Sequence, residues 1–463
     1  MTYDLAIVGS GGAGFAAAIA AKRRGLAVLM IESGTVGGTC VNVGCIPSKA
    51  LLAAGEARRV ALEQRFPGID TQAGPVDMPA LMAGQRRIVD SLRQEKYLDL
   101  SQSYGWEIVQ GSARFVPGPA LQVGGERIEA DHYLVATGAS PWVPPVEGLG
   151  GGPYLTSATA LQLDRVPESL LVVGGNYVGL ELGQLFAHLG SRVIVAEALP
   201  RLAPTEEPEI SAGIAQVLAD DGIEVVVSAP CAGVSWDGTR PRVRLGGAAQ
   251  REVTAEMLLM ATGRRPNTAE LGLEEVGVEL GPRGEVMVDS RLQTANRRIW
   301  AGGDVTGAPQ FVYVAGAHGT TVVENAFFAG DRTMDYRHLP RVTFTSPAIA
   351  AVGLTDEEAM ASGVRCSCSV LPLAYVPRAI VNRDTRGLVK IVADAVSRRV
   401  LGIHILAEGA GDMVLAATYA LEAGMTVEQL ATSWCPYLTM AEGIKLAAQA
   451  FDVDVTQLSC CAA

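Results

Sequence analysis

The sequence predicts an α/β protein in which two βαβ modules precede a separate α+β domain. Two observations predict the modules: a glycine-rich turn follows an apolar strand near residue 9, and the same arrangement recurs near residue 174. The last domain is predicted by a change of pattern beyond residue 340, where Thr- and Val-rich strands are followed by helices. The chain has 463 residues, 49% of them hydrophobic. That length suits about three domains of ordinary size.

The first module starts with an apolar strand over residues 3–8 and closes with a second strand that ends at Glu32. Between them lies Gly9-x-Gly11-x-x-Gly14, which opens a helix. These glycines allow a tight turn, close approach of a pyrophosphate and strand–helix packing, and the helix N-terminus adds amide donors. Glu32 follows at about the distance where a carboxylate can accept from a ribose hydroxyl. The module therefore predicts a Rossmann-like dinucleotide-binding domain.

The second module repeats this order, with a strand over residues 170–173, a turn from Gly174 to Gly179, a helix, and a strand that ends at Glu197. Asn176 stands where the middle glycine would be. A carboxylate at Glu197 would accept from a ribose 2′-hydroxyl and repel a 2′-phosphate, which favours NADH over NADPH. The chain thus predicts two Rossmann-like sites.

Each module is followed later in the chain by an apolar strand with a small-residue end. These segments cover residues 133–138 and 257–263, and they end in Thr137-Gly138 and Thr262-Gly263. Small residues at a strand end let a backbone approach a dinucleotide closely. We therefore expect both segments to border a dinucleotide site.

Two cysteines, Cys40 and Cys45, lie close together in the segment from Gly37 to Lys49. An ideal helix would separate them by ~7.5 Å along its axis, slightly beyond disulfide reach, so we expect a distorted first turn, which Gly44 permits. A helix N-terminus would also lower the thiol pKa. Two buried structural cysteines are the alternative, but Lys49 argues against it, because a cation there can lie beside a flavin.

This segment resembles the redox-active segment of the flavoprotein disulfide reductases, and the resemblance covers essentially the whole chain. It implies bound FAD, with Cys45 as the charge-transfer thiolate against the flavin and Cys40 as the exchange thiol. It also implies that Lys49 pairs with Glu181 near the flavin N5. Further positions that the resemblance assigns to FAD are Ala13, Gly34, Gly38, Thr39, Ala113, Asp304 on the ribityl chain, and Val312.

The family's organisation implies three domains in this chain. Residues 1–148 and 267–338 would form the FAD domain, residues 149–266 the NAD(P) domain, and residues 339–463 the dimerisation domain. The last domain would form a two-fold homodimer whose active sites are shared between subunits. Residues near the C-terminus would then serve the partner's active site.

The C-terminal region indicates the reaction. Disulfide-reducing members of the family carry His-Pro-Thr-x-x-Glu to protonate the departing thiol, but here Tyr437 stands in place of the histidine and leaves Glu442 no imidazole to orient. A phenol, with a pKa of about 10, is poorly matched to proton transfer near neutral pH. Cys460 and Cys461 are adjacent, and their ~3.8 Å Cα separation strains a disulfide, so the pair favours the dithiol. Paired soft sulfurs suit a soft, thiophilic cation.

This region is similar to that of the family members that reduce mercuric ion. The similarity implies that the terminal thiols capture Hg(II) from solvent or small thiols and pass it to Cys40 and Cys45, with Tyr177 and Tyr437 helping to hold it. It favours NADPH, whereas Glu197 favours NADH, and the choice stays open. The implied metal ligands are Cys40, Cys45, Cys460 and Cys461, and the implied NAD(P) positions are Gly174, Tyr177, Gly179, Glu181, Glu197 and Gly263.

Two other functions remain as alternatives: a dihydrolipoamide dehydrogenase-like disulfide reductase, and a thiol protein that sequesters mercury without turning it over. Cys366-Ser367-Cys368 could bind a metal, but a coincidence on a loop or edge strand is the preferred interpretation. We expect His318 to pack near the flavin domain.

Composition argues against several partners. The net charge of −12, from 49 acidic and 37 basic residues without long blocks, disfavours nucleic acid and anionic membranes. No apolar stretch reaches the ~18 uncharged residues of a membrane helix, and the N-terminus lacks a signal-peptide pattern. We therefore expect a cytoplasmic protein whose partners are small molecules.

Overall fold

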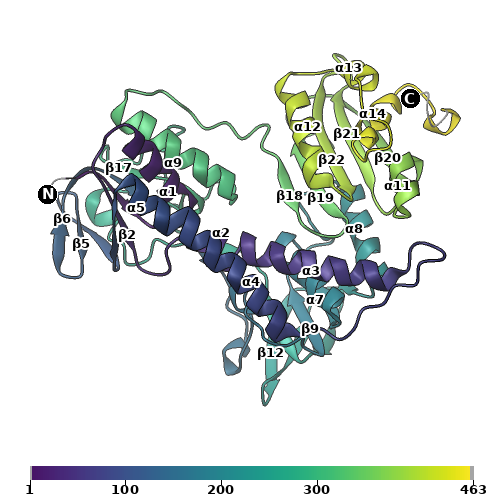
Figure 1. Cartoon of the computed structure of the whole chain (residues 1–463), viewed down its shortest axis with the longest axis horizontal. Coiled ribbons are helices and arrows are strands. Elements are labelled where there is room, and N and C mark those ends of the chain that lie inside the picture. Colours follow the sequence, from purple (N-terminus) through teal and green to yellow (C-terminus); the bar gives the residue numbers. More distant parts are fainter. Residues whose placement is uncertain (1–2, 459–463) are drawn as a thin grey trace. The chain divides into compact units, whose positions relative to one another are not determined.

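The computed structural model describes residues 3–458, which divide between two units (Figure 1). The first unit takes the described residues within Met1–Ala50, Pro79–Val143 and Thr262–Met334, and the second takes those within Leu51–Met78, Pro144–Ala261 and Asp335–Ala463. Cys460 and Cys461 lie outside the described residues. The division into three domains stays a prediction.

A five-stranded parallel sheet forms the centre of the first unit, in the order β17-β7-β1-β2-β3. Its strands are β1 (Tyr3–Val8), β2 (Val28–Glu32), β3 (Glu107–Gln110), β7 (Ala130–Val135) and β17 (Ile299–Ala301). The last four residues of β1 and the last three of β7 are buried, as expected for a parallel sheet covered on both faces. The predicted first module is therefore confirmed.

Helices α1 (Gly12–Arg23) and α9 (Val312–Phe327) lie side by side in the first unit (Figure 1). A Cβ added to Gly319 of α9 would collide with the carbonyl oxygen of Ala13. The two helices can approach this closely only because a glycine stands there.

The other elements of the first unit surround this sheet. They include α2 (Gly38–Val43), η1 (Gln94–Leu98), α5 (Asp99–Tyr104), the antiparallel strands β4 (Ala113–Val116), β5 (Ala120–Val123) and β6 (Glu126–Ile128), the pair β8 (Ala139–Pro141) and β16 (Arg264–Pro266), and the short helices η3 (Glu274–Val276) and η4 (Asp304–Thr306). Two helices, α3 (Cys45–Glu63) and α4 (Met78–Arg93), have residues in both units.

The second unit contains the predicted second module. Its parallel sheet has the order β11-β10-β9-β15, from β9 (Ser169–Val173), β10 (Arg192–Ala196), β11 (Glu224–Val226) and β15 (Met257–Met260). The helices are α6 (Ser157–Ala160), α7 (Tyr177–Leu189), α8 (Pro208–Asp220) and η2 (Leu149–Gly151), and a three-stranded sheet is formed by β12 (Cys231–Asp237), β13 (Arg240–Leu245) and β14 (Arg251–Thr254). The predicted strands and helix of this module are confirmed.

The chain beyond residue 340 forms the predicted α+β arrangement. Its antiparallel sheet has the order β18-β19-β22-β21-β20, which makes β20 an edge strand. The strands are β18 (Arg341–Thr343), β19 (Ala348–Gly353), β20 (Cys366–Pro372), β21 (Leu388–Asp394) and β22 (Val400–Ala407). The helices are α10 (Asp356–Ala361), η5 (Leu373–Tyr375), α11 (Pro377–Asn382), α12 (Ala410–Glu422), α13 (Val427–Thr432), α14 (Glu442–Gln449) and η6 (Val455–Gln457).

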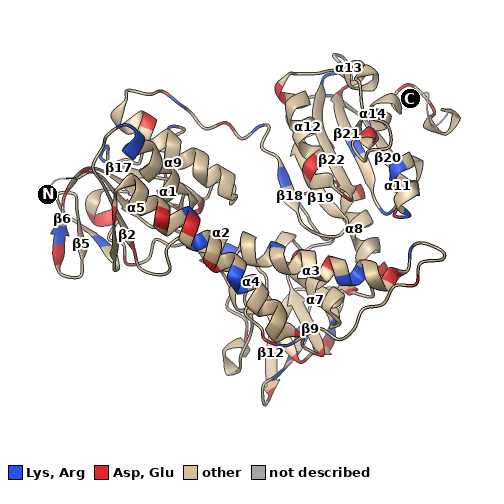
Figure 2. Ribbon diagram, in the orientation of Figure 1, with Lys and Arg blue, Asp and Glu red and all other residues tan. Residues whose placement is uncertain are grey.

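Charged residues are distributed over both units. In Figure 2, Lys and Arg lie among Asp and Glu and do not gather into one basic stripe.

Within residues 3–458, no helix combines the length and apolar character needed to cross a membrane.

Candidate active site

The three glycines of the first turn each have the role that the motif predicts. Gly9 has a φ of 105°, and a Cβ there would collide with the carbonyl oxygen of Ala136. A Cβ on Gly14 would collide with the carbonyl oxygen of Gly9. In contrast, a Cβ on Gly11 would have no atom within 4 Å, so space is open above this backbone. Open space at a helix N-terminus fits a pyrophosphate.

Glu32, at the end of β2, is held by the turn itself. Its Oε2 accepts from the Ser10 amide at 3.0 Å and the Ser10 hydroxyl at 2.5 Å, and its Oε1 accepts from the Gly34 amide at 2.6 Å. The buried Ser10 hydroxyl also accepts from the Gly37 amide at 3.0 Å. Ser10 therefore joins the glycine turn to the redox segment. Ser10 was not predicted, because a small hydroxyl side chain inside the glycine motif is its only distinguishing feature in the sequence.

In the second module, Glu197 is held by backbone amides in the same way as Glu32. Glu197 is 7% exposed. Its Oε2 accepts from the Gly175 amide at 2.6 Å and its Oε1 from the Leu199 amide at 2.8 Å. Glu32 likewise accepts from the second residue of its turn and from the amide two residues further on. The two carboxylates are therefore equivalent in position.

Asn176 explains why the second turn lacks its middle glycine. Asn176 is the N-cap of α7, and its Oδ1 accepts from the Tyr177 amide at 2.9 Å. The flanking glycines stay necessary, because a Cβ on Gly174 or Gly179 would collide with backbone, at Ala261 and at Gly174 respectively. The asparagine replaces an open glycine with a helix cap.

Both predicted Thr-Gly ends present open, left-handed glycines. Gly138 has a φ of 68° and Gly263 a φ of 113°, and a Cβ on either would have no atom within 4 Å. Thr137 is fixed beside Gly138, because its hydroxyl donates to the Asn267 carbonyl at 2.7 Å and its own carbonyl accepts from the Asn267 side-chain amide at 2.9 Å. Asn267 is a further residue that sequence reasoning missed.

Asp304 begins η4 in the first unit. Burial raises the pKa of its carboxyl group, and the guanidinium of Arg264, 4.0 Å away, opposes that rise. Next to it, the Gly303 amide donates to Nδ1 of the buried His318 at 3.0 Å. Burial lowers the pKa of His318 to about 4, so this imidazole is neutral at neutral pH. The expected packing of His318 in the flavin-type unit is confirmed.

The remaining residues predicted to contact FAD also belong to the first unit. Ala13 is buried in α1, and Val312 opens α9 with its Cγ2 3.3 Å from the place of a Cβ on Gly12. A Cβ on Gly38 would lie 2.7 Å from the Gly11 Cα, so the loop before α2 lies on the glycine turn. The other predicted positions in this unit are Gly34, Thr39 and Ala113. Open glycines, a buried carboxyl and a helix N-terminus in one unit fit FAD.

The two cysteines lie on either side of a helix break. Helix α2 ends at Val43 and α3 begins at Cys45, with Gly44 between them at φ −128° and ψ −114°. A Cβ on Gly44 would lie 2.9 Å from the Thr39 carbonyl oxygen and 3.3 Å from the Cys40 Cα. The expected distortion at Gly44 is therefore confirmed as a complete interruption. Both cysteines are thiols in this structure.

The expected lowering of the thiol pKa is wrong for Cys40. Its hydrogen bond with the Cys45 side chain and its burial raise the pKa of Cys40, and the charge of Lys49 only partly opposes them. The sequence reasoning considered the helix N-terminus alone and left out the repulsion between neighbouring sulfurs. Two thiolates in contact repel each other, so the second proton is held more tightly.

Two residues that sequence reasoning missed support the cysteine pair. The Asn42 side-chain amide donates to the Gly38 carbonyl at 2.9 Å, and its oxygen accepts from Arg93 Nη1 at 3.1 Å. Tyr97 lies on the π-helix η1, and its pKa is raised by burial and by the charges of Cys40 and Cys45. Tyr97 therefore lies near the pair although it is distant in sequence, and no motif marks it.

Four predicted residues carry roles that remain predictions. Lys49 belongs to the first unit and Glu181 to the second, so their pairing stays a prediction. Glu181 is buried and its Oε1 accepts from the Phe344 amide at 2.9 Å. Tyr177 opens α7 and is 39% exposed, and Tyr437 is 48% exposed. Both phenol rings are therefore partly accessible in the second unit.

Glu442, at the start of α14, has one carboxyl oxygen without a partner among residues 3–458, although the group accepts a backbone hydrogen bond from Leu438. The side chain is buried, and its Oε2 has no hydrogen-bond partner within the described part of the chain. Burial raises the pKa of this group. A buried carboxyl normally has a partner, and Tyr437 stands where the family resemblance implies a histidine.

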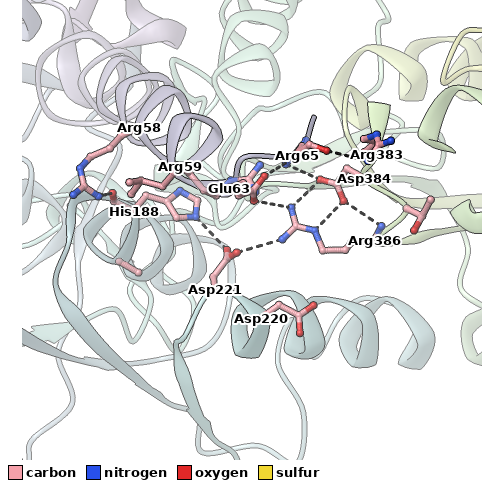
Figure 3. A pocket seen from close by; sticks show the side chains of 13 residues that line it. Arg58, Arg59, Glu63, Arg65, His188, Asp220, Asp221, Arg383, Asp384 and Arg386 are labelled. Carbon is pink, nitrogen blue, oxygen red and sulfur yellow. Dashed lines mark hydrogen bonds and ion pairs between the residues drawn. The ribbon is translucent and has the colours of Figure 1, made fainter. Parts of the chain in front are cut away.

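A charged cavity of about 530 Å³ in the second unit contains none of the predicted residues. Figure 3 shows Arg386 between Asp221 and Asp384, with His188 on the other side of Asp221. Arg386 lies 3.2 Å from Asp221 Oδ1 and 2.8 Å from Asp384 Oδ2, and His188 Nε2 lies 3.1 Å from Asp221 Oδ2. Arg386 pairs with both carboxylates, so we interpret the cavity as an ion-pair network.

Comparisons with known proteins agree with this geometry. The model of the pyridine nucleotide-disulphide oxidoreductases matches residues 3–319, and that of their dimerisation domain matches residues 339–448. A mercuric reductase of Streptomyces lividans is 56% identical over 99% of this chain and 98% of its own length, and one of Staphylococcus aureus is 47% identical over 99% and 84%. The Cu(II) complex of the HOCl-induced flavoprotein disulfide reductase RclA from Escherichia coli is 30% identical, with a TM-score of 0.88 over 97% of this chain and 99% of that one. The chain belongs to the pyridine nucleotide-disulphide oxidoreductase family.

Proposed function

We propose that this protein reduces Hg(II) to Hg(0) with electrons from a pyridine nucleotide. The reaction balances as Hg(II) plus NAD(P)H giving Hg(0), NAD(P)⁺ and a proton. The observation that carries the proposal is the C-terminal segment, which keeps the acid Glu442, with one carboxyl oxygen unpartnered among the described residues, but offers Tyr437 where sulfur–sulfur cleavage would need an imidazole. The relatives named mercuric reductases support it.

The cysteine pair suits a divalent thiophilic cation. The contact between Cys40 and Cys45 raises the pKa of Cys40, so the empty pair resists a second negative charge. A cation held by both sulfurs removes that repulsion and displaces both protons. Soft thiolates favour soft metal ions. FAD, when bound, would carry electrons from the nucleotide to this site.

Delivery would depend on the C-terminal thiols. Cys460 and Cys461 would take Hg(II) from small thiols and exchange it to Cys40 and Cys45, with Tyr177 and Tyr437 holding the ion during transfer. In the dimer expected from the family's dimerisation domain, the C-terminal groups of one subunit would serve the other. We place this activity in the cytoplasm, where small thiols are the competing ligands.

The proposal is tested by measuring Hg(II)-dependent NAD(P)H oxidation and mercury vapour together, with excess thiol present. The expected result is oxidation of one nucleotide for each Hg(0) released. Turnover of lipoamide or glutathione without mercury-dependent oxidation would instead establish a disulfide reductase. Retention of the metal without vapour would establish a sequestering protein.

Replacing both terminal thiols, Cys460→Ala with Cys461→Ala, should strongly slow reduction of Hg(II) presented on a bulky thiol ligand, because that ligand must be exchanged before the ion reaches the redox pair. We expect a loss on the order of 100-fold, as for removal of a group that acts in transfer. Cys231→Ala is the matched control and should leave the rate unchanged. Full activity of the double variant with bulky ligands would remove the role of the tail.

For the nucleotide, family resemblance supports NADPH and the geometry of Glu197 supports NADH. Because Glu197 is buried and equivalent to Glu32, its charge is fixed where a 2′-phosphate would lie. Glu197→Gln should raise kcat/KM for NADPH relative to NADH by about tenfold, the effect of ~1.4 kcal/mol. Glu224→Gln, in the neighbouring strand β11, is the control. A selectivity ratio unchanged by Glu197→Gln would show that this carboxylate does not discriminate.

A further inference from the structure

Edge strand β20 carries two cysteines on one face. Along this strand Ser369 and Leu371 are buried, whereas Cys368 and Val370 are exposed. Successive side chains of a strand point to opposite faces, so Cys366 and Cys368 share the face of Val370. The pair therefore projects from the outermost strand of its sheet.

The two thiols lie near enough on this face to affect each other, because the Cys366 side chain changes the pKa of Cys368. The Cys366 thiol donates to the Asp356 carbonyl at 3.8 Å. Partial desolvation, followed by the Cys366 charge, raises the pKa of Cys368 to about 12, with Asp356 adding to the rise and Lys390 opposing it. At neutral pH Cys368 is therefore a protonated thiol, on the same face of the strand as Cys366.

We infer that Cys366 and Cys368 form a second thiophilic metal site, which binds one Hg(II) ion through both sulfurs. Binding forms two sulfur–metal bonds while the two bonds from Hg(II) to its incoming ligands break. The two thiol protons pass to those departing ligands, and no electron is transferred. The site is therefore independent of the proposed reduction. It lies in the second unit, whereas Cys40 and Cys45 belong to the first.

The ligand set selects the kind of metal. Structural zinc is almost always held by four ligands, but no group of three or more His, Cys, Asp or Glu side chains suited to a metal occurs between residues 3 and 458. Two thiolates alone suit a soft ion that accepts two-coordinate sulfur. Because one strand holds both thiols, binding of the second thiol is intramolecular, which favours the chelate over two separate monothiols.

The test measures retained mercury in holoenzyme without nucleotide. The background protein carries Cys40→Ser, Cys45→Ser, Cys460→Ala and Cys461→Ala, and it is reduced, loaded with the glutathione complex of Hg(II), and desalted in excess glutathione. We expect it to retain about one Hg(II) per FAD, as fits a two-thiol chelate. Adding Cys368→Ser, which changes an exposed side chain, should abolish retention of this Hg(II) ion, because one thiol cannot chelate it. Adding Cys231→Ser instead should leave it.

Zn(II) offered in the same way should not be retained, and the ultraviolet absorption of the mercury–thiolate should disappear with Cys368→Ser. The proposed site would be overturned if the background protein and its variant without Cys366 and Cys368 retained equal amounts of mercury at equal FAD content. This experiment measures bound mercury and no turnover. A negative result would therefore remove the second metal site without affecting the proposed reduction of Hg(II).

Discussion

Replacing Cys45 with serine should abolish Hg(II)-dependent NAD(P)H oxidation, with a loss on the order of 10³-fold or more, as for removal of a group that acts as part of a catalytic unit. Cys45 is the first residue of α3 and contacts Cys40 across the break at Gly44. A serine hydroxyl keeps the size of the side chain but offers a hard oxygen in place of a soft sulfur. Cys40→Ser should have an effect of the same order, because either change leaves one sulfur.

The control for this experiment is Cys231→Ser, which changes a partly buried thiol of strand β12 with no predicted role. All three variants should retain FAD in equal amount, because the glycine turn and its acid are untouched. Mercury vapour and nucleotide oxidation are measured together at saturating thiol. Near-normal reduction by Cys45→Ser would contradict the assignment of the redox pair.

Lys390→Met should destabilise the protein by about 3–5 kcal/mol, the cost of leaving buried carboxylates without their cation. Lys390 is 1% exposed and Glu207 is fully buried, with 2.9 Å between Nζ and Oε2. Glu209 and Asp356 each lie 2.9 Å from the same ammonium. The cluster thereby joins strand β21 to the N-terminal end of α8. Thermal unfolding should show a midpoint lower by about 3–5 °C, because the entropy of unfolding of a chain of 463 residues is about 1 kcal/mol/K.

The matched control is Lys96→Met, which removes the same charge from an exposed position of η1. It should change the midpoint little, because exposed substitutions cost within about 0.5 kcal/mol. Adding Glu207→Gln to Lys390→Met should recover part of the loss, since one uncompensated buried charge is removed. If Lys390→Met and Lys96→Met unfold at the same temperature, the cluster contributes no stability.

The two modules could be predicted because their rules are local. Strand 3–8, the turn Gly9 to Gly14 and Glu32 are fixed by neighbours within one βαβ unit, and the structure places them as predicted. The break at Gly44 was also predictable, since helix geometry alone separates Cys40 from Cys45 too far.

Contacts between segments that are distant in the chain could not be predicted from the sequence. The closeness of Tyr97 to the redox pair depends on how α4 and η1 return to α2. The raised pKa of Cys40 depends on how near the neighbouring sulfur lies, and not on helix position. For Cys366-Ser367-Cys368 a loop and an edge strand both stayed open, because the Cys-Ser-Cys-Ser start of β20 lacks the apolar alternation that would favour a strand.

The interruption at Gly44 also fixes the spacing of the redox pair. In a helix each residue turns the chain by about 100°, so inserting or deleting one residue between the two sulfurs would rotate one of them away from the other. Lengthening this segment cannot be compensated by side-chain rotation, because the cysteine side chain is short. The number of residues between the cysteines is therefore as necessary for the contact between them as the sulfur atoms are.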